Sequence, residues 1–286
     1  MSVDAAGTAG ATGTAGATGT AASASDAYAP PAVALRVRDA GVAKLRSAAF
    51  PTFVLSVLAG AFIALGALFF VVVVTGSTLG FGVTRLLGGV AFSLGLILVV
   101  VAGAELFTGN VLIAMAWASR LVGTAEVLRH WLLTFVGNAV GALGTVALVW
   151  LGGIHTFSSG DVGATVAAVA EHKTGLGVVA LLALGTLCNA LVCLAVWLAQ
   201  AARSVTDKVL AIVFPISAFV AVGAEHSIAN LFLLPWAWAL ANFDGALGIA
   251  SLVNVAAVTV GNVLGGTVLV AGVYWLAYLR GAPDAA

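Results

Sequence analysis

Charged residues are scarce in this chain. Asp, Glu, Lys and Arg make up 8% of its 286 residues, hydrophobic residues make up 62%, and the mean hydropathy is +1.16. A soluble domain has about a quarter of its residues charged, because its surface must be hydrated. The composition therefore excludes a soluble domain and predicts a polytopic membrane protein.

Features of other protein classes are missing as well. The formal net charge is zero, so the chain has no basic surface for nucleic acid. Only two cysteines occur, Cys188 and Cys193, and on one helix they point to different faces and cannot pair. No second His or Cys stands at ligand spacing from His226, which argues against a metal site. We expect neither a metal nor another cofactor.

Long segments without Asp, Glu, Lys or Arg recur along the chain. They cover residues 52–75, 86–104, 131–154, 174–202, 209–224 and 245–279. The pattern predicts six transmembrane spans, of which the second and fifth continue beyond a Glu. With the N-terminus inside, nine Lys and Arg residues fall in inner segments and two, Arg85 and Lys173, in outer loops. This bias predicts that both termini lie in the cytoplasm.

The two ends of the chain differ from its middle. The Gly/Ala/Thr-rich residues 1–30 contain one hexapeptide twice in succession, at 9–14 and 15–20, and predict a disordered cytoplasmic tail. Residues 31–50 mix apolar and basic residues and predict an amphipathic helix at the inner membrane surface, either a simple anchor or a helix that gates the inner mouth. Residues 51–281 form the predicted transmembrane domain, and residues 282–286 form a short C-terminal tail.

One phrase is repeated in the two halves. Gly-Ala-Glu-x4-Asn occurs at residues 103–110 and again at 223–230, in apolar stretches that would each be about 50 Å long as one straight helix. The hydrocarbon core of a bilayer is only about 30 Å thick, and Glu105 and Glu225 would be costly in lipid. We therefore predict that spans two and five are broken beside a polar pathway.

A second repeated phrase defines the two copies. Gly-Asn-x2-Gly occurs at residues 137–141 and 261–265, which gives repeat one over 51–154 and repeat two over 174–279. Three spans per copy is an odd number, so the copies must be inverted relative to each other. Inverted repeats place a shared site near the membrane midplane, between the copies.

The motifs also resemble those of a known family. Phe-Ser-Leu-Gly-Leu-Ile-Leu at 92–98, Ala-Glu-Leu-Phe-Thr at 104–108, Glu-His-Ser-Ile-Ala-Asn at 225–230 and Val-Gly-Asn at 260–262 resemble the formate/nitrite transporter family, closest to its formate channels. The resemblance implies an all-α, aquaporin-like fold of six spans, assembled as a homopentamer with one pore per protomer in the bacterial cytoplasmic membrane. It implies a channel or transporter for small weak-acid anions, with formate first and nitrite, hydrosulfide, acetate or lactate as alternatives.

The resemblance further assigns roles to individual residues. It implies an Ω-shaped loop at 106–108 and an S-shaped break at 225–227. The inner side of the pore would be narrowed by Leu96, Leu106 and Phe107. The outer side would be narrowed by Phe92, Val192 and Phe219. Between the two constrictions would lie Thr108, Asn189, His226 and Asn262.

These roles suggest how an anion could cross. Apolar constrictions oppose a bare charge, whereas a weak acid that becomes neutral can pass. His226 is the one intramembrane side chain expected to exchange a proton near neutral pH, so we expect the bound anion to share a proton with it. Lys173 on the outer loop would concentrate anions, and Glu225 would orient the imidazole. Each polar residue also has a purely structural interpretation, as an interhelical contact or a solvated loop charge.

Other functions are less well supported. A hydrolase built on Glu225, His226 and Ser227 is disfavoured, because neighbouring helical residues point about 100° apart and cannot form a catalytic chain. We therefore expect no enzyme. The paired Asn-Pro-Ala boxes of water channels are absent. The sequence leaves open whether the protein is a channel or a proton-coupled carrier, and it places His130 and His155 near the ends of spans, at the membrane interface.

Overall fold

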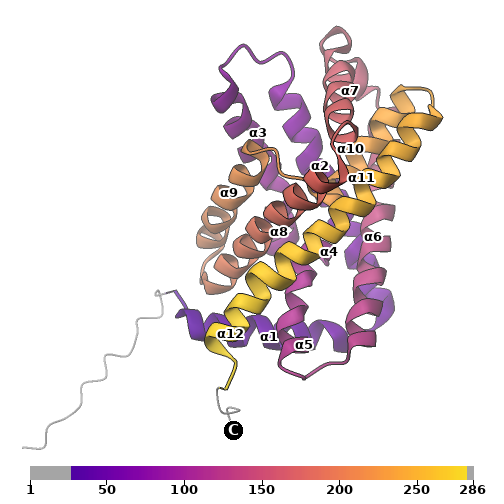
Figure 1. Cartoon of the computed structure of the whole chain (residues 1–286). Helices are drawn as coiled ribbons and strands as arrows, with labels where there is room; N and C mark the ends of the chain where they lie inside the picture. The colour runs from indigo at the N-terminus through magenta and orange to yellow at the C-terminus, as the bar shows by residue number, and fades with distance from the viewer. Residues whose placement is uncertain (1–26, 282–286) are drawn as a thin grey trace, which may run out of the picture.

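The computed structural model describes residues 27–281, and every regular element in this range is helical (Figure 1). The predicted all-α class of a membrane protein is confirmed. The predictions for the extreme ends fall mainly on residues 1–26 and 282–286, outside the described residues. The predicted disordered tail also included residues 27–30, which are ordered: the backbone N–H of Tyr28 donates to the carbonyl oxygen of Ala201 at 3.0 Å, and α1 begins at Pro30.

Five helical stretches of the described chain are long and apolar enough to cross a membrane. They are Ala49–Val74, Phe81–Gly103, Thr124–Leu151, Val178–Ala201 and Gly245–Tyr278. Two further apolar helices, Phe107–Ala118 and Ser227–Leu240, are shorter. Each of the short helices follows a point at which the chain leaves the helical conformation.

The two halves have the same order of elements: a helix, a span, a broken span and a third span. The first half consists of α1 (Pro30–Arg46), α2 (Ala49–Val74), α3 (Phe81–Ile97), the π-helix η1 (Leu98–Gly103), α4 (Phe107–Asn110), the 3-10 helix η2 (Val111–Ile113), α5 (Ala114–Ala118) and α6 (Thr124–Leu151). The second half consists of the 3-10 helices η3 (Ile154–Thr156) and η4 (Ser158–Gly160), α7 (Asp161–Thr174), α8 (Val178–Ala201), α9 (Val205–Ala221), α10 (Ser227–Leu240), α11 (Gly245–Leu264), the π-helix η5 (Gly265–Gly272) and α12 (Val273–Tyr278). In Figure 1, α1 lies across one end of the bundle beside α5 and α12, and α7 lies toward the other end beside α10.

Both predicted breaks are present, and both begin at a glycine. Gly103 has φ +85° and Gly223 has φ +77°, a left-handed conformation that side chains other than glycine's disfavour. The helix resumes at Phe107 in the first break and at Ser227 in the second. Phe107 and Thr108 therefore form the first turn of α4 and not the predicted loop, whose non-helical part is residues 104–106.

Two elements differ from the prediction. Residues 161–174, interpreted from the sequence as a loop, form α7, which buries Val162, Val166 and Ala170 along one face. The third span begins at Thr124 and not at residue 131. In both places charged residues lie within a helix near its end. The predicted spans were uncharged stretches, so they left these helical residues out.

Small residues allow the spans to approach closely. A Cβ at Gly141 on α6 would collide with the carbonyl oxygen of Val57 on α2, and a Cβ at Gly265 would collide with that of Thr186 on α8. The two contacts occupy corresponding places in the two halves. They hold each third span against its first span, as small residues do between membrane helices.

Candidate functional site

The buried carboxylate of Glu225 is held by two side chains. Its Oε1 accepts a hydrogen bond from Nζ of Lys173 at 2.9 Å, and its Oε2 accepts one from Nδ2 of Asn230 at 2.8 Å. Glu225 is 2% exposed, so this carboxylate is neutralised by a close ion pair. Lys173, predicted to lie in an outer loop, instead belongs to the last turn of α7.

The first half contains the same arrangement around Glu105. Its Oε2 accepts hydrogen bonds from Nζ of Lys44 at 2.6 Å and from Nδ2 of Asn110 at 2.7 Å. Lys44 was not predicted as a site residue. A signal for it was present, because Lys44 stands five residues before the first residue of α2, as Lys173 does before the first residue of α8.

An asparagine from each third span fixes the backbone of each break. Asn262 Oδ1 accepts from the backbone N–H of Ser227 at 2.9 Å, and its Nδ2 donates to the carbonyl oxygens of Glu225 (2.9 Å) and Gly185 (2.8 Å). These bonds occupy both N–H groups of the amide. The contacts of Asn262 thus favour a positioning role over the predicted contact with substrate.

Asn138 does the same in the first half and was missed by the sequence analysis. Its Oδ1 accepts from the N–H of Phe107 at 2.9 Å, and its Nδ2 donates to the carbonyl oxygens of Glu105 (2.9 Å) and Ser56 (2.7 Å). The sequence signal for Asn138 is the repeated Gly-Asn phrase, in which it corresponds to Asn262. Backbone groups freed by a break within a membrane need such partners.

His226 and Thr108 meet between the two repeats. His226 Nε2 lies 3.1 Å from the hydroxyl of Thr108, and its Nδ1 accepts a hydrogen bond from the backbone N–H of Ala229 at 3.1 Å. Because Nδ1 is an acceptor, the proton of the neutral ring is assigned to Nε2. Both side chains are buried, at 3% and 0% exposure. The predicted bond from Glu225 to His226 is not formed, because the Glu225 carboxylate contacts Lys173 and Asn230 instead.

Asn189 on α8 lies beside this pair. Its Nδ2 donates to the carbonyl oxygens of Asn262 at 2.7 Å and Thr108 at 3.2 Å. Its buried Oδ1 has no hydrogen-bond partner among the described residues. Asn189 therefore offers an unused acceptor, and its donors are occupied.

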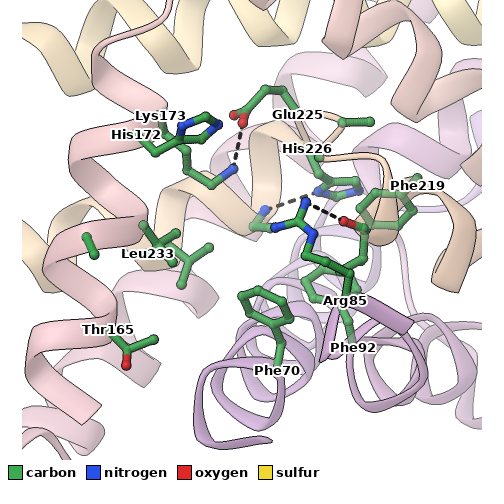
Figure 2. Close-up of a pocket in the computed structure, with 16 residues that line it drawn as sticks. Phe70, Arg85, Phe92, Thr165, His172, Lys173, Phe219, Glu225, His226 and Leu233 are labelled. Atoms are coloured by element: carbon green, nitrogen blue, oxygen red, sulfur yellow. Dashed lines mark hydrogen bonds and ion pairs between the residues drawn. The ribbon is translucent and has the colours of Figure 1, made fainter. Parts of the chain in front are cut away.

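A cavity of about 360 Å³ opens on the α7 side and reaches His226 (Figure 2). Its polar and charged lining residues are Arg85, Thr165, His172, Lys173, Glu225 and His226. Figure 2 shows the Lys173–Glu225 ion pair at one side and Arg85 beside His226 and Phe219. Arg85, which the sequence analysis treated only as a loop charge, donates to the carbonyl oxygens of Val220 at 2.7 Å and Ala221 at 3.2 Å, at the end of α9. We call this space the α7-side cavity.

A second cavity, of about 330 Å³, opens near α1 and includes Leu106 and Gly109, one on each side of the segment that holds Thr108. Its charged lining residues are Lys44 and Glu105, and Asn110 and Gln200 add amide groups. We call this space the α1-side cavity. The two cavities thus approach the Thr108–His226 pair from different sides.

Apolar side chains line both cavities near the Thr108–His226 pair. Phe92 and Phe219 line the α7-side cavity, and their rings lie edge to face with centroids 5.4 Å apart. Leu96 and Leu106 line the α1-side cavity and are 1% and 2% exposed. These four residues line the two cavities, and their role as constrictions stays a prediction.

Two other predicted constriction residues are placed differently. Val192 is buried on α8 and lines neither of the two cavities described above. Phe107 is also buried and packs edge to face against Trp131 and Phe135 of α6, with centroids 6.5 and 5.3 Å apart. Its ring points toward α6, so its contacts favour anchoring of α4 and not the predicted narrowing of a pore.

Comparison with known proteins identifies the family. The family described as Formate/nitrite transporter matches residues 31–276. The chain belongs to the formate/nitrite transporter family. Together with the spans, this confirms the predicted resemblance and makes the chain a multi-pass membrane protein.

Individual relatives in this family are similar over most of their length. Formate channel FocA from Escherichia coli is 40% identical and aligns over 89% of this chain and 96% of its own. The probable formate transporter of Methanothermobacter thermautotrophicus is 36% identical over 79% and 88% of the two chains. These relatives are channels and transporters and not enzymes, in agreement with the prediction that the 225–227 segment forms no hydrolase site.

A solved structure has the same fold. The structure described as a pentameric formate channel with formate bound superimposes with a TM-score of 0.71 at 38% identity, covering 81% of this chain and 98% of that chain. This similarity supports the arrangement of spans and breaks described above.

Proposed function

We propose that this protein is a membrane channel or transporter for small monovalent anions of weak acids, with formate as the first substrate and nitrite, hydrosulfide, acetate and lactate as alternatives. The observation that carries the proposal is the buried Thr108–His226 pair: His226 lines the α7-side cavity, and Thr108 lies between Leu106 and Gly109, which line the α1-side cavity. The names of the relatives, formate channels and transporters, support the choice of formate.

The first step of the proposed mechanism is capture of the anion. Arg85 and Lys173 bring two positive charges to the α7-side cavity and Glu225 brings one negative charge, so its fixed charge is +1 with neutral histidines. A cavity of one sign with low-dielectric walls raises the local concentration of the opposite ion. The sequence predicts that Lys173 concentrates anions, and its ammonium group would in addition be a hydrogen-bond donor that can exchange Glu225 for a carboxylate substrate.

The second step is passage of the apolar layer. Removing an unpaired anion from water costs several kcal/mol or more, and Phe92 and Phe219 offer no compensating charge. Once past them, a carboxylate oxygen can replace the Thr108 hydroxyl as acceptor of the Nε2 proton of His226. A hydrogen bond to an ionised group is about twice as strong as a neutral one, so this exchange favours the substrate.

The third step is sharing of the proton. Nδ1 of His226 already accepts the Ala229 N–H, so the ring donates from Nε2 and takes a second proton only when this helix-capping bond breaks. We therefore propose that the anion shares the Nε2 proton in a strong hydrogen bond. Full neutralisation requires a proton that enters with the substrate or one that reaches Nδ1 after the cap opens.

We also propose a homopentamer in the bacterial cytoplasmic membrane with both termini in the cytoplasm. The pentameric structural relative and the excess of Lys and Arg on one side support this arrangement. In the most apolar segment of each of the five long spans, only 28% to 44% is buried within the protomer. Most of this apolar surface is therefore available to lipid or neighbouring protomers.

A substrate panel in proteoliposomes tests the proposal. Purified protein should transport formate well above the background of protein-free liposomes, with a rate that depends on the pH gradient. Nitrite, hydrosulfide, acetate and lactate, measured in the same vesicles, rank the alternatives. Absence of protein-dependent flux for all five anions would overturn the proposed function.

A further inference from the structure

His130 on α6 contacts the Glu105 cluster from behind the α1-side cavity. Its Nε2 lies 3.1 Å from Nδ2 of Asn110 and 4.0 Å from Oε2 of Glu105. The sequence predicts that His130 lies at the membrane interface, but its side chain is buried, at 7% exposure. Asn110, Glu105 and Lys44 lie between His130 and the cavity that they line.

The hydrogen bonds around His130 fix its protonation state in this structure. Nδ2 of Asn110 donates to Glu105 Oε2 at 2.7 Å, and a carboxylate can only accept. The second N–H of the same amide is therefore left for His130 Nε2, which must accept it. His130 is assigned as neutral, with its proton on Nδ1.

The second repeat shows that this hydrogen bond does not require a histidine. Asn254 occupies the corresponding position, because it precedes Asn262 by eight residues as His130 precedes Asn138. Its Oδ1 accepts from Nδ2 of Asn230 at 2.7 Å, which is the same contact made by a group that cannot titrate. The fold therefore does not require a titratable residue at this position. Only the first repeat, on the α1 side, has one.

The surroundings of His130 supply two charged groups. Lys44 comes from α1 and Glu105 from the break, whereas α2, α4, α5 and α10, which also pack against α6, contain no Asp, Glu, Lys, Arg or His. The short helix η3 holds His155, but it follows the opposite end of α6 from His130. On α6 itself, Glu126 and Arg129 are exposed, and the Glu126 carboxylate accepts from the N–H of Gly123. The charge balance beside His130 thus depends on Lys44 and Glu105.

We propose that His130 is a proton-binding site that sets the charge of the α1-side cavity. In the neutral state the fixed charges of that cavity are Lys44 and Glu105, which sum to zero. A proton from the α1 side would bind Nε2, and the new N–H could not face the amide N–H of Asn110. Asn110 would turn away, and His130 would pair with Glu105. The charges of His130, Glu105 and Lys44 would then sum to +1. Lys44, no longer paired with Glu105, would be released toward the cavity.

The consequence concerns entry of the anion, and it rests on the proposed function. Acidification on the α1 side would turn a neutral mouth into a positive one, comparable to the α7-side cavity. A positive mouth concentrates anions and raises the rate at which dilute anion enters. Weak-acid anions leaving an acidified compartment would therefore enter the channel faster.

The experiment compares the unmodified chain with His130→Asn, which reproduces the residue found at the corresponding position of the second repeat. Flux of dilute formate is measured in right-side-out and inside-out membrane vesicles, because all copies share one orientation in a cell. The pH of the medium is lowered from 7.5 to 5.5 while the internal pH is held. Protein-free vesicles give the leak of neutral formic acid, and protease access to an N-terminal tag shows which vesicles expose α1.

We expect equal flux of the two chains at pH 7.5. At pH 5.5 the formate flux of the unmodified chain should be about threefold that of His130→Asn. This difference should occur only in vesicles whose α1 side faces the medium. Asn254→His should produce the same acid response in vesicles of the opposite orientation. If His130→Asn yields no folded protein, His130→Gln, whose amide oxygen provides a similar acceptor, replaces it.

Two contrary results have different meanings. Flux in both chains with the same pH response would overturn the role of His130 and leave the proposed function intact. Absence of formate flux in the unmodified chain at every pH would overturn the proposed function and this inference with it.

Discussion

Thr108 and His226 belong to different repeats, yet the Thr108 hydroxyl and Nε2 of His226 lie 3.1 Å apart inside the protein. Thr108 stands three residues after Glu105, and His226 stands one residue after Glu225. The repeats are therefore alike in backbone but different in the residue that each brings to the centre. The asymmetry produces a donor–acceptor pair that neither repeat contains alone.

Thr108 can be tested with a variant that keeps its shape. Thr108→Val replaces the hydroxyl by a methyl group and leaves His226 Nε2 without its acceptor. Once the anion displaces it from Nε2, the Thr108 hydroxyl can donate to the anion instead. Loss of one hydrogen bond to a charged group costs about 1.5 to 3 kcal/mol, so formate flux should fall about tenfold or more. Thr108→Ser retains the hydroxyl and should keep most of the flux. Equal flux of Thr108→Val and the unmodified chain would remove Thr108 from the transport route.

His226 has two functions that two variants separate. His226→Asn keeps a side chain that caps the start of α10, but it is too short to reach Thr108 as the imidazole does. His226→Ala loses both contacts and should also lower stability by about 1 kcal/mol. Both variants should lose about tenfold in formate flux and the pH dependence that comes from the imidazole. Flux and pH profile are measured in proteoliposomes, and stability by thermal unfolding in detergent. An unchanged pH profile in His226→Asn would contradict proton sharing at this ring.

The broken spans could be predicted because the sequence violates a length limit. An apolar stretch that is too long for the bilayer, with one carboxylate near its middle, has few stable conformations other than a break. The positive φ of Gly103 and Gly223 shows where the chain satisfies this constraint. The family resemblance then supplied the central residues Thr108 and His226, which the structure brings together.

Contacts between distant residues could not be predicted in the same way. The partner of Glu105 is Lys44, from a helix predicted only as an anchor or gate, and the sequence gives no direction for its side chain. Phe107 was assigned to a constriction by resemblance, whereas its ring packs against Trp131 and Phe135. Side-chain direction depends on the helical phase after the break, and a shift of one residue at the start of α4 changes it by about 100°.

The Lys173–Glu225 ion pair should contribute to stability as well as to anion capture. Lys173→Met would leave the Glu225 carboxylate buried without a cation, which costs about 3 kcal/mol or forces it to take a proton. The double variant Lys173→Met with Glu225→Gln removes both charges and should recover most of the stability. The net charge of the cavity stays +1 through Arg85, but the variant should still be slower than the unmodified chain at low formate concentration, because the ammonium donor for the incoming carboxylate is lost.

Thermal unfolding in detergent and initial flux at low formate concentration measure these two effects. Lys173→Arg, which keeps the charge, is the matched control. If Lys173→Met proves as stable as the unmodified chain, water solvates Glu225 and the pair is not structural. If the double variant also captures dilute formate normally, Lys173 has no part in anion entry.

The asparagine clamps should be equivalent in the two repeats. Asn262→Leu removes the bonds to the backbone of Ser227, Glu225 and Gly185 and leaves buried backbone groups unpaired, which costs about 3 kcal/mol. Asn138→Leu should cost a similar amount. Thr259→Val, which removes a hydroxyl bonded only within α11, is the control. Thermal unfolding measures the stability of the three variants. If both asparagine variants unfold at the same temperature as Thr259→Val, the breaks are held by packing alone.

Gly103 tests the backbone of the first break without any change in packing. A Cβ at Gly103 would have no atom within 4 Å, so the cost of Gly103→Ala comes from its φ of +85° alone. A left-handed conformation costs an alanine about 1 to 2 kcal/mol, so the variant should lose about that much stability and unfold at a lower temperature. Gly144→Ala is the matched control, because its Cβ also meets open space but its backbone is helical, so the substitution should stabilise slightly through helix propensity. Equal shifts in the two variants would mean that the break tolerates another conformation at Gly103, and the overlong second span would then owe its shape to the clamp at Asn138 and not to the glycine.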